Sequence, residues 1–318
     1  MRVVFMGSPA FAVPCLRAVA EVHEVALVVS QPDKPAGRGG QLAAPAVKLA
    51  ATALGLPVIQ PKSARTGELA AALAGSGAEL AIVVAYGKIL PPAVLGALPR
   101  GCLNVHGSIL PRYRGAAPVQ WAVIHGQPET GVSIMQLDEG MDTGPVLLER
   151  RVTIGPDETA GELLERLAPI GAAALLTALA EVVAGTSRAV PQDAAAATHA
   201  PMLSKTDGAV DFAGPAREVA ARIRGVDPWP GAYAQHKGQP LKLFHARATT
   251  APEALAESPG SVIAIGAHGV EVACGDGFAV TIRELQAAGR KRMTAAQFAA
   301  GRGIAVGDVL ARAEPAPS

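Results

Sequence analysis

Short, continuous apolar runs alternate with amphipathic stretches through the first half of the chain. Continuous runs are typical of strands that a parallel sheet buries on both faces, whereas amphipathic stretches are typical of helices. We predict strands at 2–6, 24–30, 58–59, 80–84, 101–105, 132–137 and 146–152. We predict helices at 12–20, 45–54, 68–73, 119–125 and 162–183. This alternation predicts an α/β domain with a Rossmann-like, mostly parallel sheet, whose ligands bind beyond the carboxyl ends of the strands.

The pattern changes after residue 185. Residues 186–205 have no apolar period and are rich in turn residues and alanine, so we predict an extended interdomain linker. After a helix at 216–224, short β-rich segments follow at 241–247, 261–265, 270–273 and 278–285. Short strands separated by glycine turns predict a smaller OB-like β-barrel domain, a fold suited to single-stranded or looped nucleic acid. The predicted domains are therefore 1–185 and 206–318, joined by the linker at 186–205.

Length and composition indicate a globular chain of two domains or one large one, but they do not by themselves indicate a nucleic-acid partner. The chain has 318 residues, of which 50% are hydrophobic and 17% are charged, which excludes a disordered chain. Its net charge is only +1, and residues 206–318 hold twelve Lys and Arg against eleven Asp and Glu. A nucleic-acid surface there would need basic residues gathered on one side. The candidates are Arg247, Arg290, Lys291 and Arg292.

The cysteines and the apolar segments indicate the compartment. Cys15, Cys102 and Cys274 are widely spaced, with no CxxC or HExxH, so we predict neither a disulfide nor a zinc site. We interpret Cys102 as core packing. The N-terminus is closer to a first strand than to a signal peptide, and proline or charge interrupts each apolar stretch of 18 residues. We therefore predict a cytoplasmic protein without a membrane span.

One stretch, GCLNVHGSILPRYRGAAP at 101–118, concentrates the candidate chemistry. Because strand side chains alternate, Asn104 and His106 project to one face about 6.6 Å apart at Cα, and a loop rich in glycine and proline follows. Asp142 lies downstream in an acidic loop, between two glycines that let the backbone fold closely around its carboxylate. An amide to hold an oxyanion, an imidazole to move a proton and a carboxylate to bias that imidazole suit acyl transfer to an amine.

Two sets of residues also have a structural interpretation. Asn104 fits a strand-end cap, His106 a hydrogen-bonded core histidine and Asp142 a turn residue, although their coincidence with the loop favours catalysis. The basic segment QPDKPAGRGGQ at 31–41 fits either a solvated loop or an arm that contacts phosphate. In the second case its Lys34 and Arg38 would supply the contacts, because such groups donate to phosphate oxygens.

Two long ordered blocks give the chain a family resemblance: NVHGSILPRYRGAAP at 104–118 and ETGVSIMQLDEGMDTGP at 129–145. Together with MRVVFMGSPAFAVP at the start and LSKTDGAVDF near residue 210, they closely resemble the 10-formyltetrahydrofolate-dependent formyltransferase family. The resemblance implies formyl transfer by Asn104, His106 and Asp142. It also implies that 10-formyltetrahydrofolate is the formyl donor, bound as a co-substrate, and that the chemistry needs no metal.

The family pattern SxLPxxxGxxP, which supports the folate, recurs here at 108–118. The residues carried over as folate contacts are Ser108, Ile109, Leu110, Pro111, Gly115 and Pro118. Tyr86, which follows the strand predicted at 80–84, fits either a folate contact on the pterin side of the site or structural packing. Proline stiffens such a loop, and glycine permits close approach of the backbone to a ligand. For the partner, the resemblance implies initiator methionyl-tRNA. Arg38 is carried over as one of its contacts, and we predict Lys34 and Lys205 as further contacts.

The implied activity is formyl transfer to the α-amino group of methionine esterified to initiator tRNA. Nothing in the sequence demands a partner chain, so we expect a monomer. Two alternatives stay open from the sequence. The same three residues would also suit a small amine, such as an amino-sugar nucleotide or glycinamide ribonucleotide, although the β-rich second domain argues against the latter. A chain of this fold would also suit a non-catalytic RNA- or folate-binding protein, although the complete set of three residues argues against it.

Overall fold

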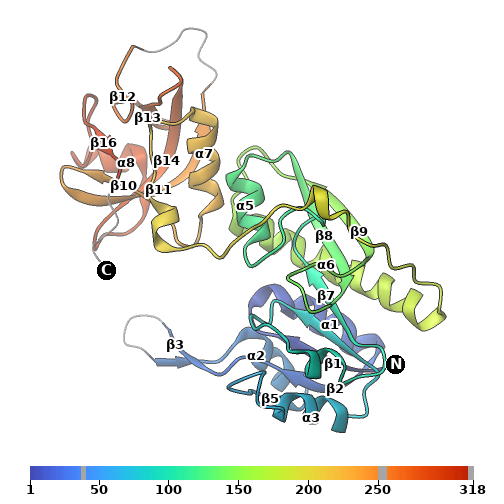
Figure 1. Ribbon diagram of the computed structural model, residues 1–318. Coiled ribbons are helices and arrows are strands. Elements are labelled where there is room, and N and C mark those ends of the chain that lie inside the picture. Colours follow the sequence, from blue (N-terminus) through green and yellow to red (C-terminus); the bar gives the residue numbers. More distant parts are fainter. Residues whose placement is uncertain (37–40, 250–255, 314–318) are drawn as a thin grey trace. The chain divides into compact units, whose positions relative to one another are not determined.

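The computed structural model describes residues 1–36, 41–249 and 256–313, and its chain separates into two compact units (Figure 1). Unit 1 contains Met1–Pro118, Thr130–Val152 and Leu164–Pro201, and unit 2 contains Val119–Glu129, Thr153–Leu163 and Met202–Ser318. Each unit is built on its own large sheet.

Unit 1 contains a seven-stranded sheet in the order β5-β2-β1-β6-β7-β8-β9. The first five strands of this order are parallel, and β8 is antiparallel to β7, which confirms the predicted Rossmann-like, mostly parallel sheet. The strands are β1 Arg2–Gly7, β2 Glu24–Val29, β5 Val58–Ile59, β6 Leu80–Val84, β7 Cys102–His106, β8 Glu129–Gln136 and β9 Val146–Thr153. The ends of β1, β6 and β7 therefore form one carboxyl edge, where ligands of such sheets bind.

Helices cover this sheet, because the apolar side chains of its strands point to both faces. The helices are α1 Val13–Val22, α2 Ala46–Ala53, α3 Glu68–Gly75, α4 Pro92–Leu95 and α6 Ala160–Ala184, and a 3₁₀ turn at Ala10–Ala12 precedes α1. On one face, Val4 and Met6 of β1 share a buried core with Leu69 and Leu73 of α3. Each such side chain contributes roughly 1.5–3 kcal/mol when it is fully buried. This buried core therefore stabilises the strands whose ends form the carboxyl edge.

Among the described residues, α6 is the one helix long and apolar enough to cross a membrane, judged by length and composition. A helix in the core of a globular domain passes the same test. A Cβ on its Gly171 would lie 3.2 Å from Val105 and 3.7 Å from Val132, and its Leu167 and Leu175 are fully buried. We therefore interpret α6 as a core helix.

The basic segment 31–41 contains part of a two-stranded ribbon that projects from unit 1 (Figure 1). The ribbon consists of β3 Lys34–Ala36 and β4 Gln41–Ala43. At its base, Lys48 Nζ donates to both oxygens of Asp33 at 2.9 and 2.8 Å, and Gln60 Nε2 donates to Asp33 Oδ1 at 2.7 Å. These hydrogen bonds, from Gln60 and then Lys48, lower the pKa of the Asp33 carboxyl. Arg38 lies outside the described residues.

Unit 2 contains a second sheet, in the order β12-β13-β14-β11-β10-β16, with β15 paired to β14. Its strands are β10 Ala232–His236, β11 Gln239–Ala248, β12 Val262–Gly266, β13 Gly269–Ala273, β14 Ala279–Ala287, β15 Met293–Thr294 and β16 Leu310–Ala311. Ser261, beside β12, forms an antiparallel bridge with Val309, beside β16. The two ends of the strand order therefore meet, which confirms the prediction of a small β-barrel.

The helices of unit 2 are α7 Ala216–Gly225 and α8 Ala295–Ala300, and α5 Pro118–Ile124 belongs to it from Val119 onward. The sequence does not predict β10 or α8. Strand β10 alternates buried and half-buried positions, but its buried side chains include two alanines, which contrast little with their neighbours. Helix α8 is only six residues long, too short for a period, and a capping box of Thr294 and Gln297 starts it.

Residues 186–201, the greater part of the predicted linker, lie along unit 1. Val146 and Val190 each donate a backbone hydrogen bond of 2.9 Å to the other's carbonyl oxygen. Further along, Arg114 forms a parallel bridge with His199. This segment therefore adds backbone pairing beside both β9 and the loop that follows β7.

Candidate active site

Strand β7 carries the first two candidate residues to the carboxyl edge of the unit 1 sheet. Its Val105 lies against Gly171 of α6, so Asn104 and His106, one position to either side, point to the opposite face. In the antiparallel register with β8, His106 lies opposite Ser133. The carboxamide and the imidazole therefore share one face of the sheet.

The imidazole of His106 faces protein groups at both ring nitrogens. Nε2 lies 2.9 Å from the backbone oxygen of Tyr113, and because a carbonyl only accepts, Nε2 carries a hydrogen there. Nδ1 lies 3.7 Å from Oδ2 of Asp142. The residue is only 5% exposed. The ring orientation is thus fixed, with Nδ1 directed at a carboxylate.

The carboxylate of Asp142 lies between that imidazole and a backbone amide. Its Oδ2 accepts a hydrogen bond of 2.8 Å from the amide of Gly115 while it faces His106. Asp142 has a φ of 53°, in the left-handed region that few residues other than glycine adopt. The structure therefore brings Asp142, from the loop after β8, into contact with His106, the last residue of β7. The backbone conformation of Asp142 needs support from its surroundings.

Asn104 differs from these two residues in its hydrogen bonding. Its side chain is half-buried, and among the residues that the structure describes no protein group forms a hydrogen bond with its carboxamide. Both amide hydrogens therefore remain available to a ligand. A preorganised donor of this kind stabilises an oxygen that gains negative charge.

The loop after β7 is fixed from the sheet by Ser133. Ser133 Oγ donates to Ser108 O at 2.7 Å and accepts from Leu110 N at 3.1 Å. Ser108 Oγ in turn donates to Arg112 O at 2.6 Å. Sequence reasoning misses Ser133, because only the register of β8 against β7 places it under the loop.

The path of this loop also requires glycine at position 115. Gly115 has a φ of 124°, and a Cβ there would lie 2.6 Å from the backbone oxygen of Ala200. Six of the predicted folate contacts lie on the loop: Ser108, Ile109, Leu110, Pro111, Gly115 and Pro118. The structure holds these residues at the carboxyl edge, and their contact with a folate stays a prediction.

Tyr86, the remaining predicted folate contact, follows β6 at the same edge. Its side chain is 1% exposed and packs in the unit 1 core with Met6 and Val29. Burial raises the pKa of its phenol, and within the described ranges its hydroxyl has no hydrogen-bond partner. Its backbone oxygen accepts from Gln31 Nε2 at 2.8 Å. The phenol thus lies in the core, and a folate contact through this residue stays a prediction.

Two of the predicted tRNA contacts are exposed. Lys34, on β3, donates to Gln31 Oε1 at 2.6 Å. Because Gln31 also holds the Tyr86 carbonyl, the base of the β3–β4 ribbon is joined to the carboxyl edge of unit 1. Lys205 begins a 3₁₀ turn, Lys205–Gly208, in unit 2.

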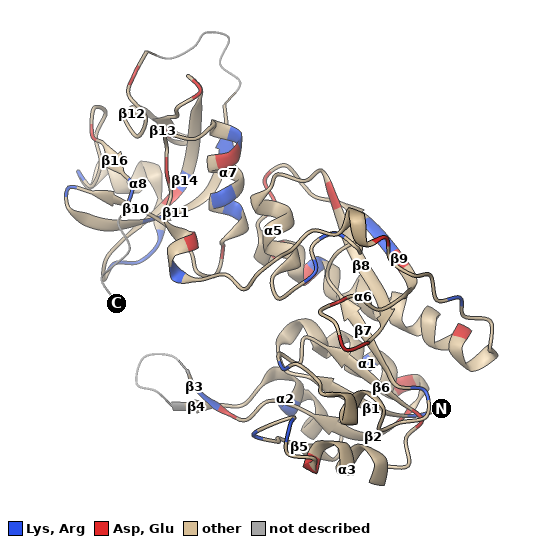
Figure 2. Cartoon of the chain, viewed as in Figure 1, with Lys and Arg blue, Asp and Glu red and all other residues tan. Residues whose placement is uncertain are grey.

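In unit 2, the side chains of Arg224, Arg247 and Arg283 surround the carboxylate of Asp157. Arg224 lies on α7, along which Figure 2 shows basic residues. Asp157 Oδ2 lies 3.6 Å from Arg247 Nη1 and 3.3 Å from Arg283 Nη2. Burial and the charge of Arg247 lower the pKa of the Arg224 guanidinium, while Asp157 opposes this shift. This arginine cluster, Arg224, Arg247 and Arg283, therefore has an excess of positive charge.

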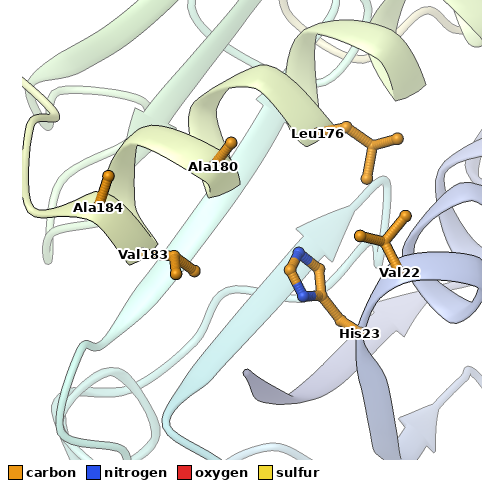
Figure 3. Close-up of a pocket in the computed structure, with 6 residues that line it drawn as sticks. All are labelled: Val22, His23, Leu176, Ala180, Val183 and Ala184. Carbon is orange, nitrogen blue, oxygen red and sulfur yellow. The ribbon is translucent and has the colours of Figure 1, made fainter.

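A hollow of about 340 Å³ lies elsewhere in unit 1, between the last turns of α1 and α6 (Figure 3). Its lining consists of Val22, His23, Leu176, Ala180, Val183 and Ala184. Helix α1 leads into β2, so its last turn lies at the amino edge of the parallel strands. This hollow is therefore at the edge opposite His106 and takes no part in the candidate site.

The cysteines are inert by burial. Cys15, Cys102 and Cys274 are buried and unpaired, and burial raises the pKa of their thiols to about 12, 11 and 12 respectively. Cys102 belongs to the unit 1 core, as predicted. Protonated thiols of this kind are poor nucleophiles and poor ligands. Within the described part of the chain, no group of three His, Cys, Asp or Glu side chains is placed to hold a metal ion.

Solved structures of low identity share this fold. A sugar 3N-formyl transferase, WlaRD, in the presence of dTDP and 5-N-formyl-THF, superposes with a TM-score of 0.68 at 14% identity over 92% of this chain and 99% of that one. HypX from Aquifex aeolicus, in complex with tetrahydrofolic acid, gives a TM-score of 0.61 at 19% identity over 93% of this chain and 46% of that one. Both likenesses concern the fold.

Much closer relatives are similar over nearly the whole chain. A methionyl-tRNA formyltransferase of Sorangium cellulosum (strain So ce56) is 50% identical over 98% of this chain and 100% of its own length. Another, of Myxococcus xanthus (strain DK1622), is 46% identical over 96% of each chain. The family model described as formyl transferase matches residues 1–179, and the model of the formyl transferase C-terminal domain matches residues 202–303. The chain therefore belongs to the formyl transferase family, in which it is similar over nearly its full length to methionyl-tRNA formyltransferases.

Proposed function

We propose that this protein transfers the formyl group of 10-formyltetrahydrofolate to the α-amino group of methionine on initiator tRNA, giving N-formylmethionyl-tRNA for translation initiation. The observation that carries the proposal is the contact of His106 with Asp142 at the carboxyl edge of unit 1, on the sheet face that Asn104 shares, in a chain of this family. We place the reaction in the cytoplasm, in a monomer that uses residues 1–185 for the chemistry and 206–318 for the tRNA, joined by 186–205.

The carboxyl edge fits a formyl donor. When bound, 10-formyltetrahydrofolate supplies a formyl carbon that an amine can attack, and negative charge then develops on the formyl oxygen. Asn104 has no protein partner for its carboxamide among the described residues and would donate to that oxygen. Mutational losses at comparable donors correspond to about 3 kcal/mol of transition-state stabilisation. We propose that the residues of loop 107–118, with Tyr86, hold the folate.

The pair of His106 and Asp142 would manage the proton that the amine loses. The attacking nitrogen loses a proton, and the folate nitrogen needs one as its bond to the formyl carbon breaks. His106 Nδ1, which faces the Asp142 carboxylate, lies at the position from which a proton can be held and passed on, directly or through water. No covalent bond between enzyme and substrate is needed.

We select the residues that would contact the tRNA by their positive charge. We propose that Lys34 of β3, Arg38, Lys205 and the arginine cluster of unit 2 contact backbone phosphates, because guanidinium forks match phosphate oxygens. The cluster supports this role because one carboxylate, Asp157, faces three arginines. Amino-sugar nucleotides are the rival acceptor, since a sugar formyl transferase shares the fold.

The test is a formyl-transfer assay with 10-formyltetrahydrofolate and either charged initiator tRNA or a dTDP-amino sugar. We expect turnover with the tRNA and none with the sugar nucleotide. A folded His106→Ala variant should lose at least 100-fold in kcat. Near-normal turnover of that variant would remove His106 from the mechanism, and a preference for the sugar nucleotide would contradict the proposed acceptor.

A further inference from the structure

The segment 192–200 lies along the two loops that meet at His106. Its Thr198 accepts a hydrogen bond from Tyr113 N to Oγ1 at 2.8 Å. The backbone then continues the contact, because Arg114 N donates to Thr198 O at 2.8 Å and Ala200 N donates to Arg114 O at 2.7 Å. This segment therefore fixes Tyr113, whose carbonyl oxygen accepts a hydrogen bond from His106 Nε2.

Gln192 joins the same segment to the second loop. Its Oε1 accepts from Arg114 Nε at 3.0 Å and from Nη2 at 2.8 Å. Its Nε2 donates to Asp142 O at 2.9 Å and to Gly144 O at 2.7 Å. These four contacts use both hydrogens and both lone pairs of the amide, so one orientation of the side chain satisfies all of them.

Thr198 and Gln192 act on opposite sides of the His106 imidazole, each through one residue that the ring faces. His106 meets Tyr113 O at Nε2 and Asp142 Oδ2 at Nδ1. Thr198 holds the first of these residues and Gln192 holds the second. Both held residues have positive φ, 60° for Tyr113 and 53° for Asp142, and such conformations persist when neighbouring groups fix them.

The strength of the Gln192 contacts follows from the burial of their partners. Arg114 is 8% exposed, so the hydrogen bonds from its guanidinium replace water that it has lost. A hydrogen bond to a charged donor is stronger than one between neutral groups. The Asp142 loop is therefore tied, through one neutral amide, to a buried cation that the backbone of 198–200 also holds.

We propose that Gln192 and Thr198 are positioning residues that set the His106 imidazole against the Asp142 carboxylate for proton transfer. This inference rests on the proposed function, since it names the groups that align its proton-transfer pair. The role is indirect: neither side chain needs to touch the substrates.

The test compares Gln192→Met, Gln192→Glu and Thr198→Val with the parent protein. Methionine fills a similar volume without hydrogen bonds, and glutamate keeps the acceptor for Arg114 but loses both donors to the Asp142 loop. We expect kcat to fall about 30-fold in both Gln192 variants and about 5-fold in Thr198→Val, with KM for methionyl-tRNA unchanged. Thr198→Ser, which keeps the hydroxyl, should restore kcat.

The matched control is Asp193→Asn, one position along the same segment. Asp193 is exposed, and its carboxylate accepts from Ala195 N within its own turn. We expect it to keep the parent kcat. Thermal unfolding of each variant identifies any loss that is due to misfolding, and a folded Gln192→Met with parental kcat would overturn the proposal.

A measurement that does not depend on turnover separates the positioning role of Gln192 and Thr198 from the proposed function. Nitrogen NMR of the imidazoles, with the His106 signals assigned from His106→Gln, should show both His106 ring nitrogens shifting in Gln192→Met. If the parent transfers no formyl group but these signals shift, the proposed function fails and the positioning role stands. If the parent is active and the signals and kcat of Gln192→Met match the parent, the positioning role fails alone.

Discussion

The carboxyl edge of unit 1 and the arginine cluster of unit 2 both gather charged side chains, but they hold them in different ways. At the edge, directional hydrogen bonds of 2.7 to 2.9 Å fix the groups around His106, which is 5% exposed. In the cluster, the side chains of Arg247 and Arg283 are 57% and 48% exposed and meet Asp157 at 3.6 and 3.3 Å. Short-range geometry suits chemistry on a small group. Exposed charge suits a large, highly charged partner, and salt screens it.

The largest effect is expected at Asn104. Because its role depends on a directional hydrogen bond, we expect a loss of kcat that is the same at low and high salt. Asn104→Ala should lower kcat for formyl transfer by about 100- to 1,000-fold, because it removes one donor to the developing oxyanion. Steady-state kinetics at low and high salt, with unfolding midpoints, measure this. Gln136→Ala is the control, since that amide contacts Arg100 O away from the carboxyl edge. A folded Asn104→Ala enzyme of near-parental kcat would contradict the oxyanion role.

The next effect concerns the loop that shapes the edge. Gly115→Ala should lower the free energy of unfolding by about 2–4 kcal/mol, since a Cβ would meet Ala200 O at 2.6 Å in a backbone of positive φ. Gly55→Ala is the matched control, because Gly55 also has a positive φ of 68° but no atom within 4 Å of the added Cβ. That change should have an effect of about 1 kcal/mol. Urea unfolding of both variants measures the difference, and equal losses would show that the contact with Ala200 is unimportant.

The arginine cluster should give a smaller effect that depends strongly on salt. Arg247→Gln and Arg283→Gln should each weaken binding of methionyl-tRNA by about tenfold at low salt, and each should reduce the salt slope by about 1. Asp157→Asn should tighten binding, because it removes the carboxylate that competes with phosphate. Binding titrations over a series of salt concentrations measure these changes. Arg312→Gln, whose parent residue pairs with Asp211, is the control. Slopes equal to the parent in both arginine variants would exclude the cluster from the tRNA surface.

The smallest effect is a dependence of stability on pH in the barrel of unit 2. Burial of Asp308 would raise its pKa, but hydrogen bonds from Lys237, His236 and the Ala305 amide outweigh this and lower the pKa to about 2. A carboxyl group whose pKa is lower in the folded than in the unfolded state stabilises the folded state at pH values above its unfolded pKa. This contribution is lost as the pH falls toward the folded pKa of about 2. It should amount to about 1–2 kcal/mol, because Lys237 is exposed.

Urea unfolding of Asp308→Asn measures this contribution. Between pH 5 and pH 7 the variant should be less stable than the parent, and the difference should shrink as pH is lowered below about 4, where unfolded aspartate takes up a proton. A difference that stayed constant down to the lowest pH of the folded state would contradict the role of the charge.

Much of the architecture follows from local pattern, as two strands illustrate. The continuous apolar run at Leu80–Val84 predicts β6 to the residue, because a strand buried on both faces has no polar positions. The alternating β10 escapes prediction, since its buried alanines give little hydrophobic contrast. The length of α6 is likewise predicted to within two residues at its start and one at its end, from leucines at near-helical spacing.

The candidate site is predictable only in part, because its supports come from distant segments. Strand alternation suffices to place Asn104 and His106 on one face. Ser133, Gln192 and Thr198 carry no local signal, and a polar segment such as 186–205 has the composition of a linker whether or not it contacts a loop. Their hydrogen bonds become visible only when the chain is folded.

The sequence by itself determined the two folds, the facing of Asn104 and His106 and the family, because these depend on periodicity and on ordered motifs that neighbouring residues set. The tertiary structure alone decided which groups surround the imidazole, that the Asp142 carboxylate lies at Nδ1 rather than in open solvent, and which arginines share Asp157. The physical reason is range: secondary structure depends on neighbours along the chain, whereas a hydrogen bond between two loops depends on the packing of everything between them.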